Sequence, residues 1–593
     1  MLPRNLSTPT WFRPVHRAGI ALVLLLATVA PASQSVPVFP RSVPGRFEVT
    51  GLDFRPTGAW RQRTEAIRGA RRGLLRGGLL SRLNRGFPAL RVQGNYHVPV
   101  IPITFPAIPA PFPSASYAGV LFNAGGPGQP YSIRSYYAEV SRGAIDIDGV
   151  VFGWVIADSA DTYYEDGCNG VGVITSCPHG GRRFGDLLLE AVSRSDTGTV
   201  DWGQFDNDGA DGLPNSGDDD GVVDFVTFLQ PEVDGACGTT NLWAHRYDLA
   251  AWNGGSAYVT ITPRRDGTGQ PMPGRFIQIR DYTLQSAVGG PSACTDGVIM
   301  PIGTMAHETG HAFGLPDLYD TNLGNAGVTQ GIGEWGLMGS GNYAQPYSPA
   351  GYDAWSLVEL GWAQVDTLRT NASITLGPVQ LGDTVLYAAV PGTDEYFLFE
   401  NRQARGSDSA QLNPGCLFGT RSCAKSPGLL IWHIDSGQVL AHGFRRDNRV
   451  NSGPVHGVAL IQADGLNQLR TPGLKNRGDP GDSWPGASGN TFFGPTTNPA
   501  ALDNRGASAG FFLDSIRQVA PGGAVAFRFT TLTPGQIFVT LPWAAGQVLG
   551  EGTLGSAQTI HLDSLGNRNG SFDVGDFLAY YRSIAPDVRR GTP

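Results

Sequence analysis

The spacing of apolar residues changes along the chain and separates regions of different predicted structure. Up to about residue 92, leucines recur at partly helical spacing: Leu74, Leu75, Leu79, Leu80 and Leu83. Strand-like runs (YHVPVIPITF, GVLFNAGG, IDGVVFGWVIA) then alternate with helical patterns (YSIRSYYAEVSRGAI, FGDLLLEAVSRSD). From about Ala363 helical periodicity largely ceases, and runs such as TVLYAAV, EYFLFENRQ and GLLIWHID are separated by turn residues. We therefore predict an α+β protein in which a mixed unit precedes a β-sandwich.

The first 33 residues have the pattern of a signal peptide. Three arginines precede the apolar run AGIALVLLLATVA, and the small residues Ala30 to Ala32 offer a cleavage site. That run is too short for an ordinary transmembrane helix, and no other stretch is long enough to span a bilayer. We therefore expect an exported, extracellular protein with no membrane partner after cleavage.

Composition narrows the class of protein. Only 16% of the 593 residues are charged, while glycine (82) and proline (43) are abundant, which favours a loop-rich, β-containing secreted protein. The formal net charge of −8 argues against nucleic acid as a partner and agrees with carboxylates that lie near cations. The six cysteines of an exported chain favour structural disulfides, and their order suggests Cys168–Cys177, Cys237–Cys294 and Cys416–Cys423.

The candidate chemistry lies in PIGTMAHETGHAFGLPDLYD, Pro301 to Asp320. In a helix, His307 and His311 lie on one face about 6 Å apart along the axis, so both imidazoles can point at one ion. Zinc accepts such nitrogens and keeps a water in the open position of a catalytic site. Glu308 is next to the first histidine, where a carboxylate can take a proton from that water. We therefore predict a zinc hydrolase rather than a helix with two solvated histidines.

A turn after the second histidine offers a third ligand. Gly314 permits a sharp bend out of the helix. Asp317 falls six residues after His311, where the returning chain can supply an oxygen ligand. Asp320 is close by and is the alternative third ligand.

A glycine-rich turn, Trp335 to Gly341, follows further on and surrounds Met338, one of five methionines. Such a turn beneath the ligands is typical of the metzincins. Tyr343, just after the turn, is a candidate for stabilising the oxyanion, and ordinary packing is the alternative.

The stretches HETGHAFGLPDLYD and WGLMGSGNY together resemble the secreted bacterial metalloproteases related to immune inhibitor A, whose extended motif is H-E-x-x-H-x-x-G-x-x-D. The resemblance implies zinc ligation by His307 and His311, with Asp317 matching the third ligand. It also implies that Glu308 is the general base and Met338 the methionine of the turn. SYYAEVSRGAIDIDGVVFGWV, EYFLFENRQ and GLLIWHID are similar to the same family, so the resemblance covers roughly residues 90–530.

The predicted domains follow from these patterns. After the signal peptide (1–33), the arginine-rich residues 34–92 are interpreted as a removable prosegment, because a secreted protease must be held inactive and exposed arginines invite cleavage. The alternative is a basic surface helix that stays attached, and Asp53 is a candidate carboxylate plug for the site. Residues 93–365 form the predicted zinc metalloprotease catalytic domain, 366–534 the β-sandwich domain, and 535–593 a linker and tail.

An acidic loop, FDNDGADGLPNSGDDDGVVDFVTFL, carries seven aspartates between Asp206 and Asp224. Aspartates separated by glycines supply hard oxygen ligands on a sharply bending chain, which suits calcium. Without a cation their carboxylates would repel one another, and a solvated acidic loop is the alternative. The candidate calcium ligands are Asp206, Asp208, Asp211, Asp218, Asp220 and Asp224.

The C-terminal stretch LDSLGNRNGSFDVGDFLAYY is similar to half of a dockerin module. It fills five positions of an EF-hand-like calcium loop with Asn567, Asn569, Gly570, Asp573 and Asp576. Leu565 stands where an aspartate is required, so a plain helix-capping turn is the alternative.

These patterns together predict a secreted zinc metalloendopeptidase, made as a zymogen, that hydrolyses proteins through a zinc-activated water with Glu308 as general base. The alternatives are a calcium-dependent adhesin or scaffold with a vestigial protease body, and a zinc amidase. The intact HETGH with its glycine, aspartate and methionine argues against a vestigial site. A long chain with a flanking β-domain suits extended polypeptides rather than small amides.

Overall fold

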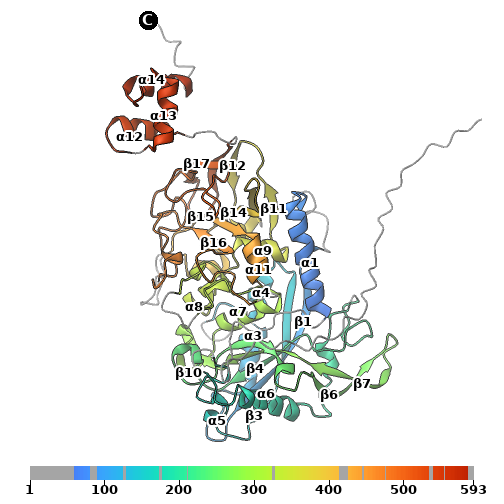
Figure 1. The fold of residues 1–593 in the computed structure, drawn as a ribbon. Coiled ribbons are helices and arrows are strands. Elements are labelled where there is room, and N and C mark those ends of the chain that lie inside the picture. Colours follow the sequence, from blue (N-terminus) through green and yellow to red (C-terminus); the bar gives the residue numbers. More distant parts are fainter. Residues whose placement is uncertain are drawn as a thin grey trace, which may run out of the picture. The chain divides into compact units, whose positions relative to one another are not determined.

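The structure is a computed structural model, and its described residues are 59–80, 90–123, 129–172, 176–209, 211–322, 328–382, 384–412, 425–443, 447–474, 476–532, 539–552 and 554–584 (Figure 1). They all fall within the unit Phe39–Pro593. The predicted signal peptide, Asp53 and the predicted Cys416–Cys423 pair lie outside the described residues. Helices and strands are mixed throughout, which confirms the α+β class.

The first part of the fold is built on a sheet with the strand order β2-β1-β4-β8-β5. The strands are β1 (Gly94–Thr104), β2 (Ile145–Val151), β4 (Val226–Gln230), β8 (Asp281–Ser286) and β5 (His245–Asp248), and the short β3 (Val155–Ile156) pairs with the end of β1. Neighbouring strands are parallel except β5, which runs antiparallel to β8. In β1, Val98 and Val100 enter one apolar cluster, and Ile101 and Ile103 enter another. Both faces of this strand are therefore buried, which explains why YHVPVIPITF shows no clean alternation.

Helices cover the two faces of this sheet. The first cluster contains side chains of α3 (Ser114–Phe122), α4 (Ile133–Val140), α7 (Gly303–Ala312) and α9 (Ala354–Leu360). The second contains side chains of α5 (Asp161–Glu165) and α6 (Arg182–Ser195). Two antiparallel strand pairs complete this part: β6 (Tyr258–Arg265) with β7 (Pro271–Ile279), and β9 (Val288–Gly289) with β10 (Thr295–Ile299). The second pair leads directly into α7.

The prediction of a strand at GVLFNAGG is wrong. The last residues of helix α3 are Val120, Leu121 and Phe122, and all three side chains are buried. A short apolar run that is buried on all sides has the same pattern in a strand and in a helix, so periodicity could not separate the two.

The second part is dominated by two sheets. A five-stranded sheet has the order β11 (Gln364–Thr367), β13 (Thr384–Ala389), β14 (Glu395–Arg402), β15 (Gly428–Asp435) and β16 (Val458–Ile461). A three-stranded sheet has the order β12 (Ala372–Leu376), β18 (Val525–Thr531) and β17 (Phe511–Gln518). Two short helices, α10 (Val379–Gly382) and α11 (Ser436–His442), lie between the strands in sequence. Both sheets contribute side chains to one apolar cluster, and the assignment as a β-sandwich stays a prediction.

The two parts share a core. Phe397 and Ile431 point into the cluster between the two β-sheets, whereas Leu398 and Trp432 belong to the cluster that also holds Met305 of α7. Strands β14 and β15 are therefore buried on both faces, so the first part and the β-rich half of the fold are packed against each other through apolar side chains.

Two helical segments flank these parts in sequence. Helix α1 (Ala59–Arg76), blue in Figure 1, packs against α9. The C-terminal helices α12 (Leu541–Val548), α13 (Ser556–Leu565) and α14 (Val574–Ile584) enclose a small apolar cluster of their own. In the loop between α13 and α14, Asn567 and Asn569 both donate to Asp573, so the helix–loop–helix is present, and calcium binding there stays a prediction. Among the described helices, none is long and apolar enough to cross a membrane.

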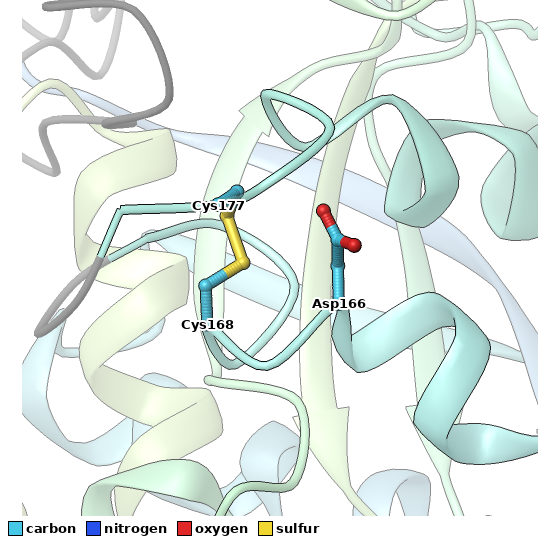
Figure 2. A group of neighbouring side chains, drawn as sticks. All are labelled: Asp166, Cys168 and Cys177. Atoms are coloured by element: carbon cyan, nitrogen blue, oxygen red, sulfur yellow. A yellow bond between two sulfur atoms is a disulfide. The ribbon is translucent and has the colours of Figure 1, made fainter.

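Two of the predicted disulfides are confirmed. Cys168–Cys177 and Cys237–Cys294 have S–S distances of 2.00 Å. Figure 2 shows the carboxylate of Asp166 beside the first bridge, and it accepts hydrogen bonds from His179. Because both sulfur atoms of this group are bonded to each other, they are not available as thiolate ligands for a metal.

The two bridges should differ in what they contribute to stability. Their cysteines are 9 and 57 residues apart. Loop-closure entropy gives about 3 kcal/mol for the short loop and about 4 kcal/mol for the long one. We therefore expect the double variant Cys237→Ser/Cys294→Ser to lose more free energy of unfolding in urea than Cys168→Ser/Cys177→Ser. Equal losses would show that chain entropy is not the main contribution.

Candidate metal centre

Helix α7, Gly303–Ala312, carries the H-E-x-x-H sequence and is almost wholly buried. Met305, Ala306 and Ala312 pack into the first apolar cluster, and the hydroxyl of Tyr137 donates to the carbonyl of Ala306 at 2.6 Å. The helix ends at Ala312, and the chain bends away at Gly314, whose φ of +86° is in the left-handed region that favours glycine. The chain can therefore turn back toward the histidines, as the sequence predicted.

Three side chains converge beside this helix. The Nε2 atoms of His307 and His311 lie 2.9 and 3.4 Å from Oδ1 of Asp317. Each of the three residues is buried. Asp320 points elsewhere, since its carboxylate accepts from the main-chain N–H groups of Asn322 and Thr329. The structure thus brings Asp317, and not Asp320, together with the two histidines.

The donor set fits a zinc ion. Nδ1 of His307 lies 2.8 Å from the carbonyl of Leu337, and Nδ1 of His311 lies 2.7 Å from the carbonyl of Leu315. Donation from Nδ1 to these carbonyls leaves Nε2 of each ring as the metal-binding atom. Two imidazole nitrogens and one carboxylate oxygen are a ligand set typical of catalytic zinc, with the fourth position open.

The charges of this cluster are coupled. Burial by itself lowers the pKa of His307, but its hydrogen bond to Asp317 and the charge of that carboxylate raise it to about 9. Burial likewise opposes ionisation of Asp317, and the two histidines more than reverse this and hold its pKa below the usual range. The carboxylate therefore attracts positive charge to the space between the rings, where a proton or a cation fits.

Glu308 is a buried carboxylate next to these residues in the helix. Burial raises the pKa of Glu308, and the charges of His311 and His307 oppose that shift. A carboxylate with a raised pKa holds a proton more readily, which is what a general base at this position requires.

The methionine turn lies directly under helix α7. A Cβ atom added to Gly310 would meet the Sδ atom of Met338 at 2.5 Å, so the helix and the turn lie in close contact at this glycine. The carbonyl of Met338 accepts from the N–H of Leu318 at 2.7 Å, beside Asp317. Its neighbour Leu337 accepts from His307. The turn around Met338 thus orients His307 and fixes the main chain next to Asp317.

Tyr343 lies in the short helix α8 (Asn342–Ala344), after the turn. Burial raises the pKa of its phenol, and the nearby charges of Asp234 and Glu308 raise it further. The phenol therefore stays protonated near Glu308 and is able to donate a hydrogen bond. Its role at the oxyanion stays a prediction.

Sequence reasoning missed two residues of this centre. Asn448, in the loop after α11, accepts from the N–H of Asp317 at 2.9 Å and donates to its Oδ2 atom at 2.7 Å. The ring of Tyr319 stacks on that of His307 with centroids 6.1 Å apart. Asn448 is 131 residues from Asp317 in sequence, so no local pattern could have indicated it. Tyr319 lies within the motif, and its proximity to the ligands was the available signal.

The acidic loop brings together three carboxylates, those of Asp206, Asp208 and Asp219, all buried. Burial, and then the charges of neighbouring aspartates, raise the pKa of Asp206 to about 9 and that of Asp224 well above its usual value. The sequence had not singled out Asp219. Three other predicted calcium ligands accept hydrogen bonds from the main chain of the same loop. Asp211 accepts from the N–H of Leu213, Asp218 from the N–H of Asp211, and Asp220 from the N–H of Val222.

Comparison with known proteins identifies a matching family. Residues 113–364 match the model of the immune inhibitor A peptidase M6 catalytic domain. The chain is 28% identical over 237 residues to the pre-pro-metalloprotease PrtV of Vibrio cholerae serotype O1 (strain M66-2), a match that covers 38% of this chain and 23% of that protein. It is 28% identical over 221 residues to Immune inhibitor A of Bacillus thuringiensis subsp. alesti, covering 36% of this chain and 29% of that protein. The chain thus spans less than a third of the length of either relative.

The two neighbouring aspartates should differ in their effect on metal retention. Asp317→Asn removes a charged oxygen from the cluster, so we expect roughly a 100-fold or greater loss of zinc affinity, more than loss of an outer partner costs. Asp320→Asn should retain zinc, because the carboxylate of Asp320 accepts from the main-chain N–H groups of Asn322 and Thr329 and does not join the histidines. Zinc content after dialysis against a graded chelator series measures both. Equal retention by the two variants would contradict the assignment of Asp317.

Proposed function

We propose that the protein is an exported zinc endopeptidase that hydrolyses peptide bonds of proteins, because residues 113–364 match the model of the immune inhibitor A peptidase catalytic domain. The observation that carries the proposal is the convergence of His307, His311 and Asp317 beside a buried glutamate. The metzincin-like assignment belongs to the same proposal and is supported by the contact of Met338 with the zinc helix at Gly310.

His307, His311 and Asp317 are the residues proposed to hold the metal. When bound there, zinc supplies Lewis acidity, which lowers the pKa of water and polarises a carbonyl group. The chain's own contribution is orientation. Hydrogen bonds from Nδ1 to main-chain carbonyls fix both imidazoles, and Asn448 fixes the carboxylate.

Glu308 is proposed to move the proton. Its carboxylate takes a proton from the attacking water and passes it to the amine that leaves, so that the carboxylate is regenerated in each cycle. The raised pKa of Glu308 suits this exchange because the carboxyl group must hold the proton between the two steps. The protonated phenol of Tyr343 is the candidate donor to the oxyanion of the tetrahedral intermediate.

The acidic loop is proposed to bind calcium through Asp206, Asp208 and Asp219, with Asp224 close by. The support is chemical. Burial with several like charges pushes the pKa of Asp206 to about 9, so these groups cannot all ionise at neutral pH without a cation. Carboxylate oxygens on a glycine-rich loop are the ligands that calcium prefers. We expect the ion to brace the loop that precedes β4.

Glu308→Gln should retain zinc and lose hydrolysis. The amide keeps the shape of the side chain but cannot accept a proton, so we expect kcat on a casein substrate to fall by roughly 10²- to 10⁴-fold. The exposed Glu551→Gln is the matched control and should leave both quantities unchanged. Activity assays and metal analysis on the same preparations test this. Casein cleavage by Glu308→Gln at the parent rate would overturn the proposed role.

The calcium-free protein should lose stability as pH rises. Asp206 has a folded pKa of about 9 against an ordinary value of 3.8, so the folded state holds a proton that the unfolded state has released between these values. The free energy of unfolding should therefore decrease from pH 5 to pH 8, and calcium should raise it more at pH 8 than at pH 5. Denaturant titrations at both pH values, with and without calcium, measure the effect.

Two substitutions sharpen this test. Asp206→Asn should reduce the difference between the two pH values, because the amide does not ionise, whereas Asp224, whose pKa is also raised, keeps its own contribution. Asp211→Asn, at an exposed position of the same loop, should preserve it. If calcium stabilises the protein equally at pH 5 and pH 8, the coupling to Asp206 is wrong.

A further inference from the structure

The turn that carries Asp317 has little regular structure of its own. It follows Gly314 and reaches Thr321 without entering a helix or strand. Within the matched catalytic domain, its main chain is joined to Met338 by Leu318 N–H and to Ile332 by the Leu318 carbonyl. Further bonds to this turn come from residues that lie outside 113–364, on both sides of the match.

The β-rich half supplies one set of these bonds. Asn448, which is 1% exposed, binds both the main-chain N–H and the Oδ2 atom of Asp317. The carbonyl of Asn448 also accepts from the hydroxyl of Thr321 at 3.0 Å. Asn451 donates to the carbonyl of Leu318 at 2.8 Å. The carboxylate and the chain around it are thus held by one loop of the β-rich half.

Helix α1 supplies the other bond. The guanidinium of Arg68 donates to the carbonyl of Gly314, the residue at which the chain turns. The same side chain is 1% exposed and lies 3.2 Å from Glu359 of α9. Arg72 also pairs with Glu359, at 2.7 Å. The arginine-rich segment that the sequence offered as removable is therefore an internal part of the fold at this point.

Separation of helix α1 from α9 would cost free energy, because it would break buried ion pairs. Glu359 is 2% exposed, and its carboxylate is paired with two arginines of α1. Arg71 of the same helix donates to the carbonyls of Val358 and Leu90 at 2.6 and 3.0 Å. Breaking a buried ion pair by removing one partner leaves an uncompensated buried charge, which is strongly destabilising.

We propose that Asn448 and Arg68 are positioning residues for the metal centre, which hold the turn carrying Asp317 from its two sides. It follows that α1 stays bound in the active enzyme and that any removable prosegment ends before residue 59. The inference rests on the proposed role of Asp317 as a ligand. Groups that fix a ligating carboxylate tune metal affinity without touching the metal themselves.

The Asn448 side of the inference is tested with a matched pair of variants. Asn448 and Asn467 both have a positive φ, +56° and +55°, so alanine strains the backbone equally at either site. Asn467 is exposed. We expect Asn448→Ala to release zinc to a chelator roughly tenfold faster than the parent and to lower kcat with KM unchanged. Asn467→Ala should match the parent protein in its rate of zinc release, its kcat and its KM. Parent-like zinc release and kcat in Asn448→Ala would overturn the inference.

The Arg68 side uses Arg68→Lys and Arg68→Met, with Arg76→Met as control. Lysine keeps the charge opposite Glu359 but lacks the planar fork that reaches two acceptors, so it should fold and still loosen the turn. Arg76 lies on the same helix and is exposed. Amide hydrogen exchange of the segment after α7, measured in the metal-free protein, should be faster in both Arg68 variants and unchanged in Arg76→Met. Unchanged exchange in Arg68→Lys would count against the inference.

Retention of α1 is read out directly by mass spectrometry of the purified active enzyme. Peptides covering 59–76 should be present in a one-to-one ratio with those of α7. A fully active enzyme that lacks them would overturn this part. If the parent protein binds no zinc, the proposed function fails, whereas hydrogen exchange in the metal-free variants still decides whether Asn448 and Arg68 hold the turn.

Discussion

The centre of this molecule depends on holding one carboxylate between two imidazoles inside the protein. Asp317 is 2% exposed, and a carboxylate at such depth stays ionised only if positive or hydrogen-bonding groups surround it. A helix provides the two histidines by spacing alone, since positions four apart share a face. Asp317 lies after the end of this helix, so helical spacing does not place its carboxylate. Its position requires a left-handed residue at Gly314 and hydrogen bonds from distant parts of the chain.

The distribution of these bonds explains how several segments act as one site. His307 is oriented by the methionine turn, His311 by the turn at Leu315, and Asp317 by Asn448. Each of the three proposed ligands therefore has an outer partner from a different segment. The histidines need only local structure. The carboxylate needs the β-rich half in place, so the site is complete only when both halves of the fold have packed.

Features of the candidate site that depend on short stretches of sequence were predicted well. The spacing of the histidines, the exit at Gly314 and the return at Asp317 are short-range features, and the structure brings these residues together. The pairing of four cysteines was predicted correctly from their order. Asn448 was missed because its partner Asp317 lies 131 residues away in sequence. Asp219 was missed because its sequence does not distinguish it from the neighbouring aspartates, whereas the fold brings it together with Asp206 and Asp208. The strand assigned to GVLFNAGG failed because complete burial removes the periodic signal. Metal binding itself is a property that neither spacing nor geometry measures, so it remains a proposal.

The shared core has a consequence for how such a chain can be exported. Trp432 and Leu460 of the β-rich half pack in the same apolar cluster as Met305 of helix α7. If the chain crosses a membrane from its N-terminus, His311 emerges about 150 residues before that cluster can close. On that route the proposed site stays incomplete until the β-rich half has emerged as well.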